Sequence, residues 1–92
     1  MGLMEVARDI APYFAGERLV ILPRRRAARL AVLDLLASRF EPGLRYPESA
    51  VNDLLACFNS DFCTLRRYLV DEGFMEREHG VYWRSGGTFE TD

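Results

Sequence analysis

The chain has 92 residues, of which 49% are hydrophobic and 28% charged, an ordinary composition for one small globular domain. Its formal net charge is −2 and all twelve basic residues are arginine, so nucleic-acid binding would require a local basic patch. No apolar run approaches the roughly 20 residues that span a bilayer, and the start of the chain lacks the pattern of a secretory signal. We therefore expect a cytoplasmic protein with no membrane association.

The first predicted element is an amphipathic helix from Leu3 to Phe14, where apolar residues recur about every four positions. Gly16 follows as a helix terminator, so residues 1–18 are expected to be an N-terminal helix and turn. The next apolar run, Leu19–Leu22, ends at Pro23 and predicts a short strand or extended segment.

The longest predicted helix runs from Arg24 to Phe40, because Ala, Leu and Arg favour helices and the leucines recur on one side. Pro42–Gly43 ends this helix in a turn. After a short extended stretch at Arg45–Tyr46, Pro47 is expected to open a second helix that runs to about Phe58, with strong amphipathic spacing.

The third predicted helix spans Asp61 to Glu72 and follows a turn that favours helix capping, with Gly73 as its terminator. Asp61 is expected to stabilise the first turn through the helix dipole.

Two short strands, Phe74–Arg77 and Val81–Arg84, are predicted to form a hairpin with Gly80 in its turn. The polar residues 85–92 are expected to be a flexible tail.

This order of elements predicts an α+β fold that is mainly α with a small β-hairpin, namely a winged helix-turn-helix. We expect a single domain over residues 1–92, with its core in residues 19–84. The residues expected to be almost fully buried in one cluster are Leu33, Phe40, Leu54, Phe58, Leu65 and Leu69.

The chain also carries a set of short motifs spread between about Leu19 and Arg84. They are Phe40–Gly43, Tyr46 with Glu48, Val51–Asn52, Asp61, Leu65–Asp71, Arg77 and Tyr82–Trp83. In these motifs the sequence resembles an uncharacterised bacterial domain family that is often appended to winged-helix transcription regulators, including those of the arsenic-repressor type. Pro47 departs from the Ser or Thr expected there in relatives. The resemblance implies a regulatory setting and supplies no activity.

The outward side of the third helix is the first candidate site. On a helical wheel Arg67 lies almost opposite the apolar residues, and Ser60 and Thr64 share its side. An arginine there can bond bidentately to guanine if the helix enters the major groove of DNA. Asp61 and Asp71 lie close to the same surface and favour the alternative of a solvated helix face.

Four arginines at the start of the long helix form the second candidate site: Arg24, Arg25, Arg26 and Arg29. Each guanidinium can contact one backbone phosphate. The helix dipole disfavours cations at this end, so their presence favours a role in binding an anion or partner over simple solvation.

Cys57, Cys63 and His79 do not have the spacing of a metal site, and no metal or other cofactor is expected. Cys63 is placed on an exposed shoulder beside Arg66 and Arg67, where a guanidinium and a helix N-terminus favour a reactive thiolate. Incidental small residues are the alternative for both cysteines. Arg66 is predicted to brace the helix against its neighbours.

Tyr82 and Trp83 are adjacent on a predicted strand, so one should cover the core and the other should be partly exposed. No catalytic constellation is present, and we expect a protein that is not an enzyme. The sequence predicts a winged-helix transcriptional regulator that binds DNA as a homodimer. The alternatives are a protein-interaction module on the same scaffold and a winged helix associated with RNA or the ribosome.

Overall fold

The computed structural model describes residues 10–88, and their fold is α+β, as predicted. The elements in chain order are η1 (Ala11–Tyr13), β1 (Phe14–Ala15), β2 (Arg18–Leu19), α2 (Arg26–Ala37), β3 (Arg45–Pro47), α3 (Glu48–Ala56), α4 (Phe62–Asp71), β4 (Met75–Glu78) and β5 (Val81–Arg84). Within this described part, no helix has the length and hydropathy that crossing a bilayer requires.

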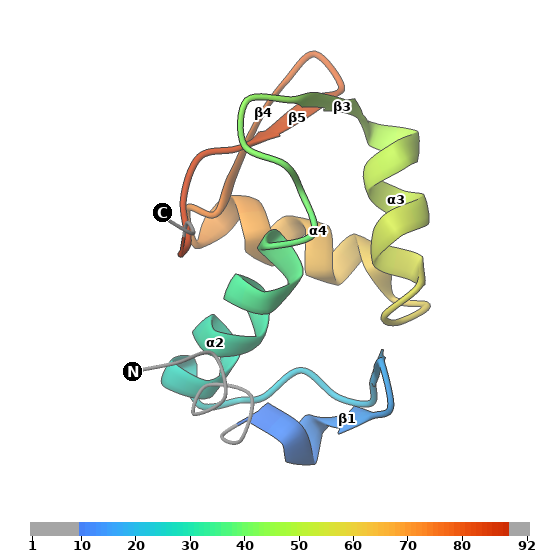
Figure 1. Cartoon of the computed structure of the whole chain (residues 1–92), viewed down its shortest axis with the longest axis vertical. Helices are drawn as coiled ribbons and strands as arrows, with labels where there is room; N and C mark the ends of the chain where they lie inside the picture. The colour runs from blue at the N-terminus through green and yellow to red at the C-terminus, as the bar shows by residue number, and fades with distance from the viewer. Residues whose placement is uncertain (1–9, 89–92) are drawn as a thin grey trace.

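The strands form two antiparallel sheets, one of β1 with β2 and one in the order β3–β5–β4. Figure 1 shows the three-stranded sheet at one end of the molecule and the β1 segment at the other, with α4 crossing between them. The extended stretch Arg45–Tyr46 was predicted, and the structure adds its partner: β3 pairs with β5, so that Tyr46 lies opposite Tyr82. This pairing brings the start of α3 next to the hairpin.

The core lies where the three helices meet the sheet. Five of the six residues expected there are nearly or fully buried: Leu33, Phe40, Phe58, Leu65 and Leu69. Leu54 is only half-buried, although it packs against the same cluster. The predicted helical faces are therefore confirmed, with Leu54 at the edge of the buried face of α3.

The helix predicted over Leu3–Phe14 lies largely on residues 1–9, outside the described part of the chain. Its last described residues differ from the prediction, because a 3-10 turn leads into β1 and Gly16 forms the turn of a hairpin with a φ of 63°. The physical reason is local. Pro12 has no backbone N–H for a helix interior, and glycine accepts the positive φ of a tight turn.

The other helix boundaries lie within a few residues of the predicted ones. Pro47 is the residue before α3 and not its first residue. Asp61 precedes α4, and its side chain makes no capping hydrogen bond. Instead, the Asp61 backbone N–H donates to Oδ1 of Asn59 at 2.7 Å. The predicted hairpin is confirmed, with His79 and Gly80 in the turn at positive φ.

Residues Ser85–Thr88 were expected to belong to a flexible tail, but hydrogen bonds tie them to the domain. Asp34 of α2 accepts from the backbone N–H and the hydroxyl of Thr88, at 2.7 and 2.8 Å. The nearly buried Arg84 donates to the carbonyl oxygens of Gly86 and Thr88. We call Ser85–Thr88 the C-terminal strap. The remainder of the predicted tail, residues 89–92, lies outside the described part.

Candidate nucleic-acid interface

A groove separates the outward side of α4 from the β4–β5 hairpin. It has a volume of about 290 Å³ and is lined by Cys63, Arg66, Arg67, Val70, Asp71, Arg77 and Tyr82. Three of these side chains are arginines and one is acidic, so the groove carries local positive charge on a chain whose net charge is −2. Arg67 is exposed here, as the helical wheel predicted. We call this feature the arginine groove.

A chain of polar contacts holds one wall of the arginine groove. The Tyr82 hydroxyl, on a side chain only 1% exposed, donates to Oε1 of Glu48 at 2.8 Å and accepts from Nη1 of Arg77 at 3.4 Å. Arg66 reaches the same Glu48 oxygen at 3.8 Å and also donates to Asn52. Its predicted bracing role is thus confirmed. The hydrogen bond from Arg77 to Tyr82 raises the pKa of Arg77 above the ordinary value of an arginine.

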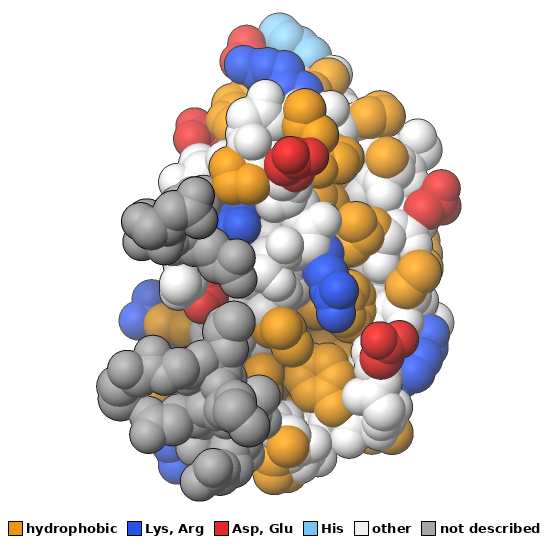
Figure 2. Space-filling model, in the orientation of Figure 1, with side chains coloured by type: hydrophobic (Ala, Val, Ile, Leu, Met, Phe, Trp, Pro, Cys, Tyr) orange, Lys and Arg blue, Asp and Glu red, His pale blue; other side chains and the backbone are white. Residues whose placement is uncertain are grey.

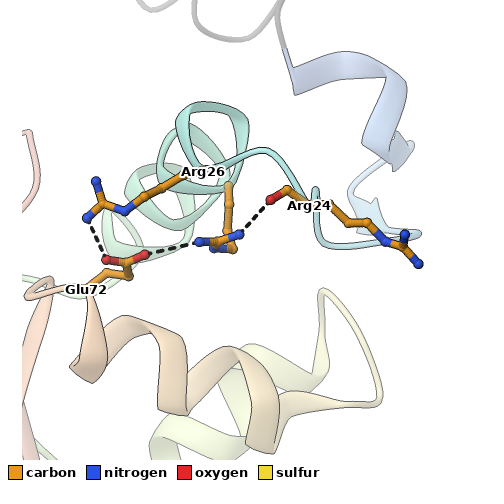
Figure 3. A network of polar contacts seen from close by, with 4 residues as sticks. Arg24, Arg26 and Glu72 are labelled. Carbon is orange, nitrogen blue, oxygen red and sulfur yellow. Dashed lines mark hydrogen bonds and ion pairs between the residues drawn. The ribbon is translucent and has the colours of Figure 1, made fainter.

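The four arginines at the start of α2 do not act as one cluster. Glu72, at the end of α4, pairs with Arg26 at 3.0 Å and with Arg29 at 3.5 Å (Figure 3). Arg29 also donates to the backbone carbonyl of Arg24, whose own side chain points away from Glu72. Arg24 and Arg25 are exposed, and in the described part their side chains have no ion pair. They are the members best placed for an external anion.

Arg29 is further enclosed by its surroundings. Its side chain is 18% exposed, its guanidinium stacks 5.2 Å from the ring centre of Tyr68, and its Nε is buried without a hydrogen-bond partner. The sequence did not show that Glu72 and Tyr68 pack against the start of α2 and enclose Arg29 in this way.

Ser60 and Thr64 do not line the arginine groove with Arg67. Thr64 borders a second hollow at the start of α4, and Ser60 is exposed in the turn before that helix. The hollow is lined mostly by the apolar segment Leu19–Leu22, together with Leu65. Thr64 therefore borders a hollow that is largely apolar, with Asn59 and Asp61 as its other polar neighbours.

Basic charge is interrupted on the face shown in Figure 2. Blue side chains stand apart from one another there, with hydrophobic and acidic side chains between them. Between α2 and α4, Glu72 pairs with Arg26 and Arg29 and so offsets part of their charge. The face shown in Figure 2 therefore carries no broad basic surface.

Both cysteines are free and exposed. Cys63 lines the arginine groove, whereas Cys57 follows α3 and its thiol donates to the carbonyl oxygen of Asp53 at 3.5 Å. His79 is 92% exposed at the hairpin tip. Among residues 10–88, no group of three or more His, Cys, Asp and Glu side chains is arranged to hold a metal ion.

We expect iodoacetate to alkylate Cys63 faster than Cys57, because its carboxylate is attracted by the arginines around Cys63. Peptide mass spectrometry over a time course measures both rates in the reduced protein. Neutral iodoacetamide is the control and should show a smaller preference. Equal rates for the two cysteines with iodoacetate would contradict the positive character of the groove.

The hairpin contributes residues that were not assigned to the site from sequence. Arg77 faces the arginine groove, and Glu48 joins it through Tyr82. The position of Arg77 could have been predicted from the alternation of side chains along the strands. Arg77 lies directly opposite Tyr82 in the hairpin, so the two side chains are on the same side of the sheet. Trp83 is partly exposed on the other side, as predicted, with the Arg45 guanidinium 4.3 Å from its ring centre.

Comparison with known proteins identifies a family. Residues 18–84 match the family described as "Uncharacterized protein conserved in bacteria (DUF2087)", and the chain belongs to it. This match confirms the resemblance to an uncharacterised bacterial domain family. It covers nearly the same residues as the motifs, which lie between about Leu19 and Arg84. No curated protein and no solved structure matches the chain.

Proposed function

We propose that the chain is a winged helix-turn-helix module that binds duplex DNA, with α4 as its recognition helix and the β4–β5 hairpin as its wing. The order α2–β3–α3–α4–β4–β5, with a β3–β5–β4 sheet, supports this assignment. In helix-turn-helix proteins the second helix of the motif lies in the major groove of DNA. Here that helix is α4, which packs against α3 across a short turn.

The arginine groove is the observation that carries the proposal. Arg67 on α4 and Arg77 on β4 are both exposed and line the same groove, so a nucleic-acid strand between helix and wing would meet positive charge from both sides. Arg67 is assigned to base edges and Arg77 to the phosphate backbone. As part of a transcriptional regulator, the module would bind a two-fold site as a homodimer.

The test is a salt titration of duplex affinity, on random duplex and on a sequence selected from a random pool. Arg67→Ala is expected to weaken binding to the selected sequence about tenfold or more, and random duplex less, because it removes a base contact. Arg25→Ala should weaken both alike and flatten the salt dependence by about one phosphate contact.

Arg39→Ala is the control, since Arg39 lies beyond the other end of α2, stacked on Phe58. It should leave the salt dependence unchanged. Wild-type binding no tighter than about millimolar at low salt would end the DNA proposal, since even non-specific binders reach roughly 10⁻⁴ to 10⁻⁶ M.

A protein partner is the second candidate, and a specific surface favours it. Val20 and Ile21 are 62% and 60% exposed beside the hollow at the start of α4. Apolar side chains this exposed on adjacent residues are typical of contact surfaces when they border a hollow. In this case Ile21→Ser would abolish association with the partner, while Arg67→Ala would leave it intact.

A further inference from the structure

The arginine groove has one wall on a helix and the other on a hairpin. The hairpin is also tied to α3: the backbone N–H of Glu48 donates to the carbonyl oxygen of Gly80 at 2.9 Å, and its carboxylate accepts from the Tyr82 hydroxyl. The same carboxylate lies 3.8 Å from Nε of Arg66 on α4. Glu48 therefore contacts both walls.

We propose that Tyr82 and Glu48 are positioning residues that hold the Arg77 guanidinium at the arginine groove, so that α4 and the hairpin present their charge to a bound anion together. The two hydrogen bonds are made in sequence: Arg77 donates to the Tyr82 hydroxyl, and this hydroxyl donates to Glu48. Without that hydroxyl, the exposed Arg77 side chain loses the side-chain hydrogen bond that holds it in the described part of the chain, and it spreads over many rotamers.

The identity of the bound anion, a backbone phosphate of duplex DNA, rests on the proposed function. The arrangement itself does not, because it is a property of the free protein. It can therefore be tested without DNA, using the thiol of Cys63 as a probe inside the groove.

The experiment uses the full chain with Cys57→Ser, so that Cys63 is the single thiol. The ratio of its alkylation rates with iodoacetate and iodoacetamide reports the positive charge beside it, and it is measured at low ionic strength because salt screens the effect. Arg77→Gln should lower the ratio about twofold, the order of effect expected when one charge near the thiol is removed in water. Tyr82→Phe should lower it by most of that factor, and adding Arg77→Gln to Tyr82→Phe should lower it only by the small remainder.

Tyr46→Phe is the matched control. Tyr46 lies opposite Tyr82 in the sheet, but its hydroxyl accepts from the backbone N–H of Glu41, away from the groove. This variant should keep the wild-type ratio of alkylation rates. Thermal unfolding is measured for both phenylalanine variants to check that each is folded. An unchanged ratio in Tyr82→Phe, or an equal effect of Arg77→Gln in both backgrounds, overturns the positioning role.

Salt titration with duplex completes the test. If DNA binds, Tyr82→Phe should flatten the salt dependence by about one phosphate, as Arg77→Gln does, and Tyr46→Phe should not. Coupling of the thiol ratios in a protein that binds no duplex would sustain the positioning role and remove the DNA proposal. Tight duplex binding without that coupling would do the reverse.

Discussion

Phe40→Ala is expected to lower the free energy of unfolding by about 3–5 kcal/mol, the usual loss for a buried phenylalanine. Phe40 is fully buried just beyond α2, and its ring meets that of Tyr46 edge-on with centres 5.2 Å apart. Truncation therefore leaves a cavity between the helices and the sheet and removes an aromatic contact. Since small domains are stable by only about 5–15 kcal/mol, this variant should be partly unfolded at 37 °C.

Urea unfolding followed by circular dichroism measures the change, with linear extrapolation to water. Phe62→Ala is the control, because it removes the same atoms from a half-buried position at the start of α4. Phe62→Ala should lower the free energy of unfolding clearly less than Phe40→Ala does. Equal losses in the two variants would mean that the packing around Phe40 contributes nothing beyond the transfer of the ring from water.

Gly86→Ala is expected to destabilise the protein by about 1–3 kcal/mol, as overpacking does. A Cβ at this position would lie 2.3 Å from the carbonyl oxygen of Gly73, a backbone atom that cannot rotate away. The C-terminal strap would have to lift, which breaks the hydrogen bond from the Gly86 N–H to the Phe74 carbonyl oxygen.

The same urea titration measures this loss, and amide exchange at Thr88 reports whether the strap has detached. Ser85→Ala is the control, since Ser85 is exposed and a change there should stay within about 0.5 kcal/mol. A stable Gly86→Ala protein with unchanged exchange at Thr88 would show that the strap does not need this close approach.

The local pattern was enough to predict the helices and the hairpin. Apolar spacing identified the buried sides of α2 and α4, and the turn at Gly80 identified β4 and β5. The pairing of β3 with β5 was beyond reach, because nothing within Arg45–Pro47 specifies a partner more than 30 residues away. Glu48 was named only as part of a motif of the family resemblance, and its contacts with Tyr82 and Arg66 depend on that pairing.

In the candidate site, too, features set by one helix could be predicted and features set by contacts between distant segments could not. Arg67 was placed correctly, because its exposure depends only on the face of one helix. The pairing of Arg26 and Arg29 could not be predicted, because Glu72 lies far along the chain from both. The C-terminal strap was missed for a similar reason, since Asp34 gave no sign that it would bind Thr88. Both of the missed features depend on a polar partner that lies far away along the chain.

The pairing of Glu72 with Arg26 and Arg29 also bears on how the domain folds. A carboxylate beyond the last turn of α4 and two cations in the first turn of α2 each oppose the dipole of their own helix. Brought together, the three groups satisfy one another, so each helix removes the electrostatic penalty of the other. Neither helix should therefore persist alone as a peptide, and the two should form in a single cooperative step.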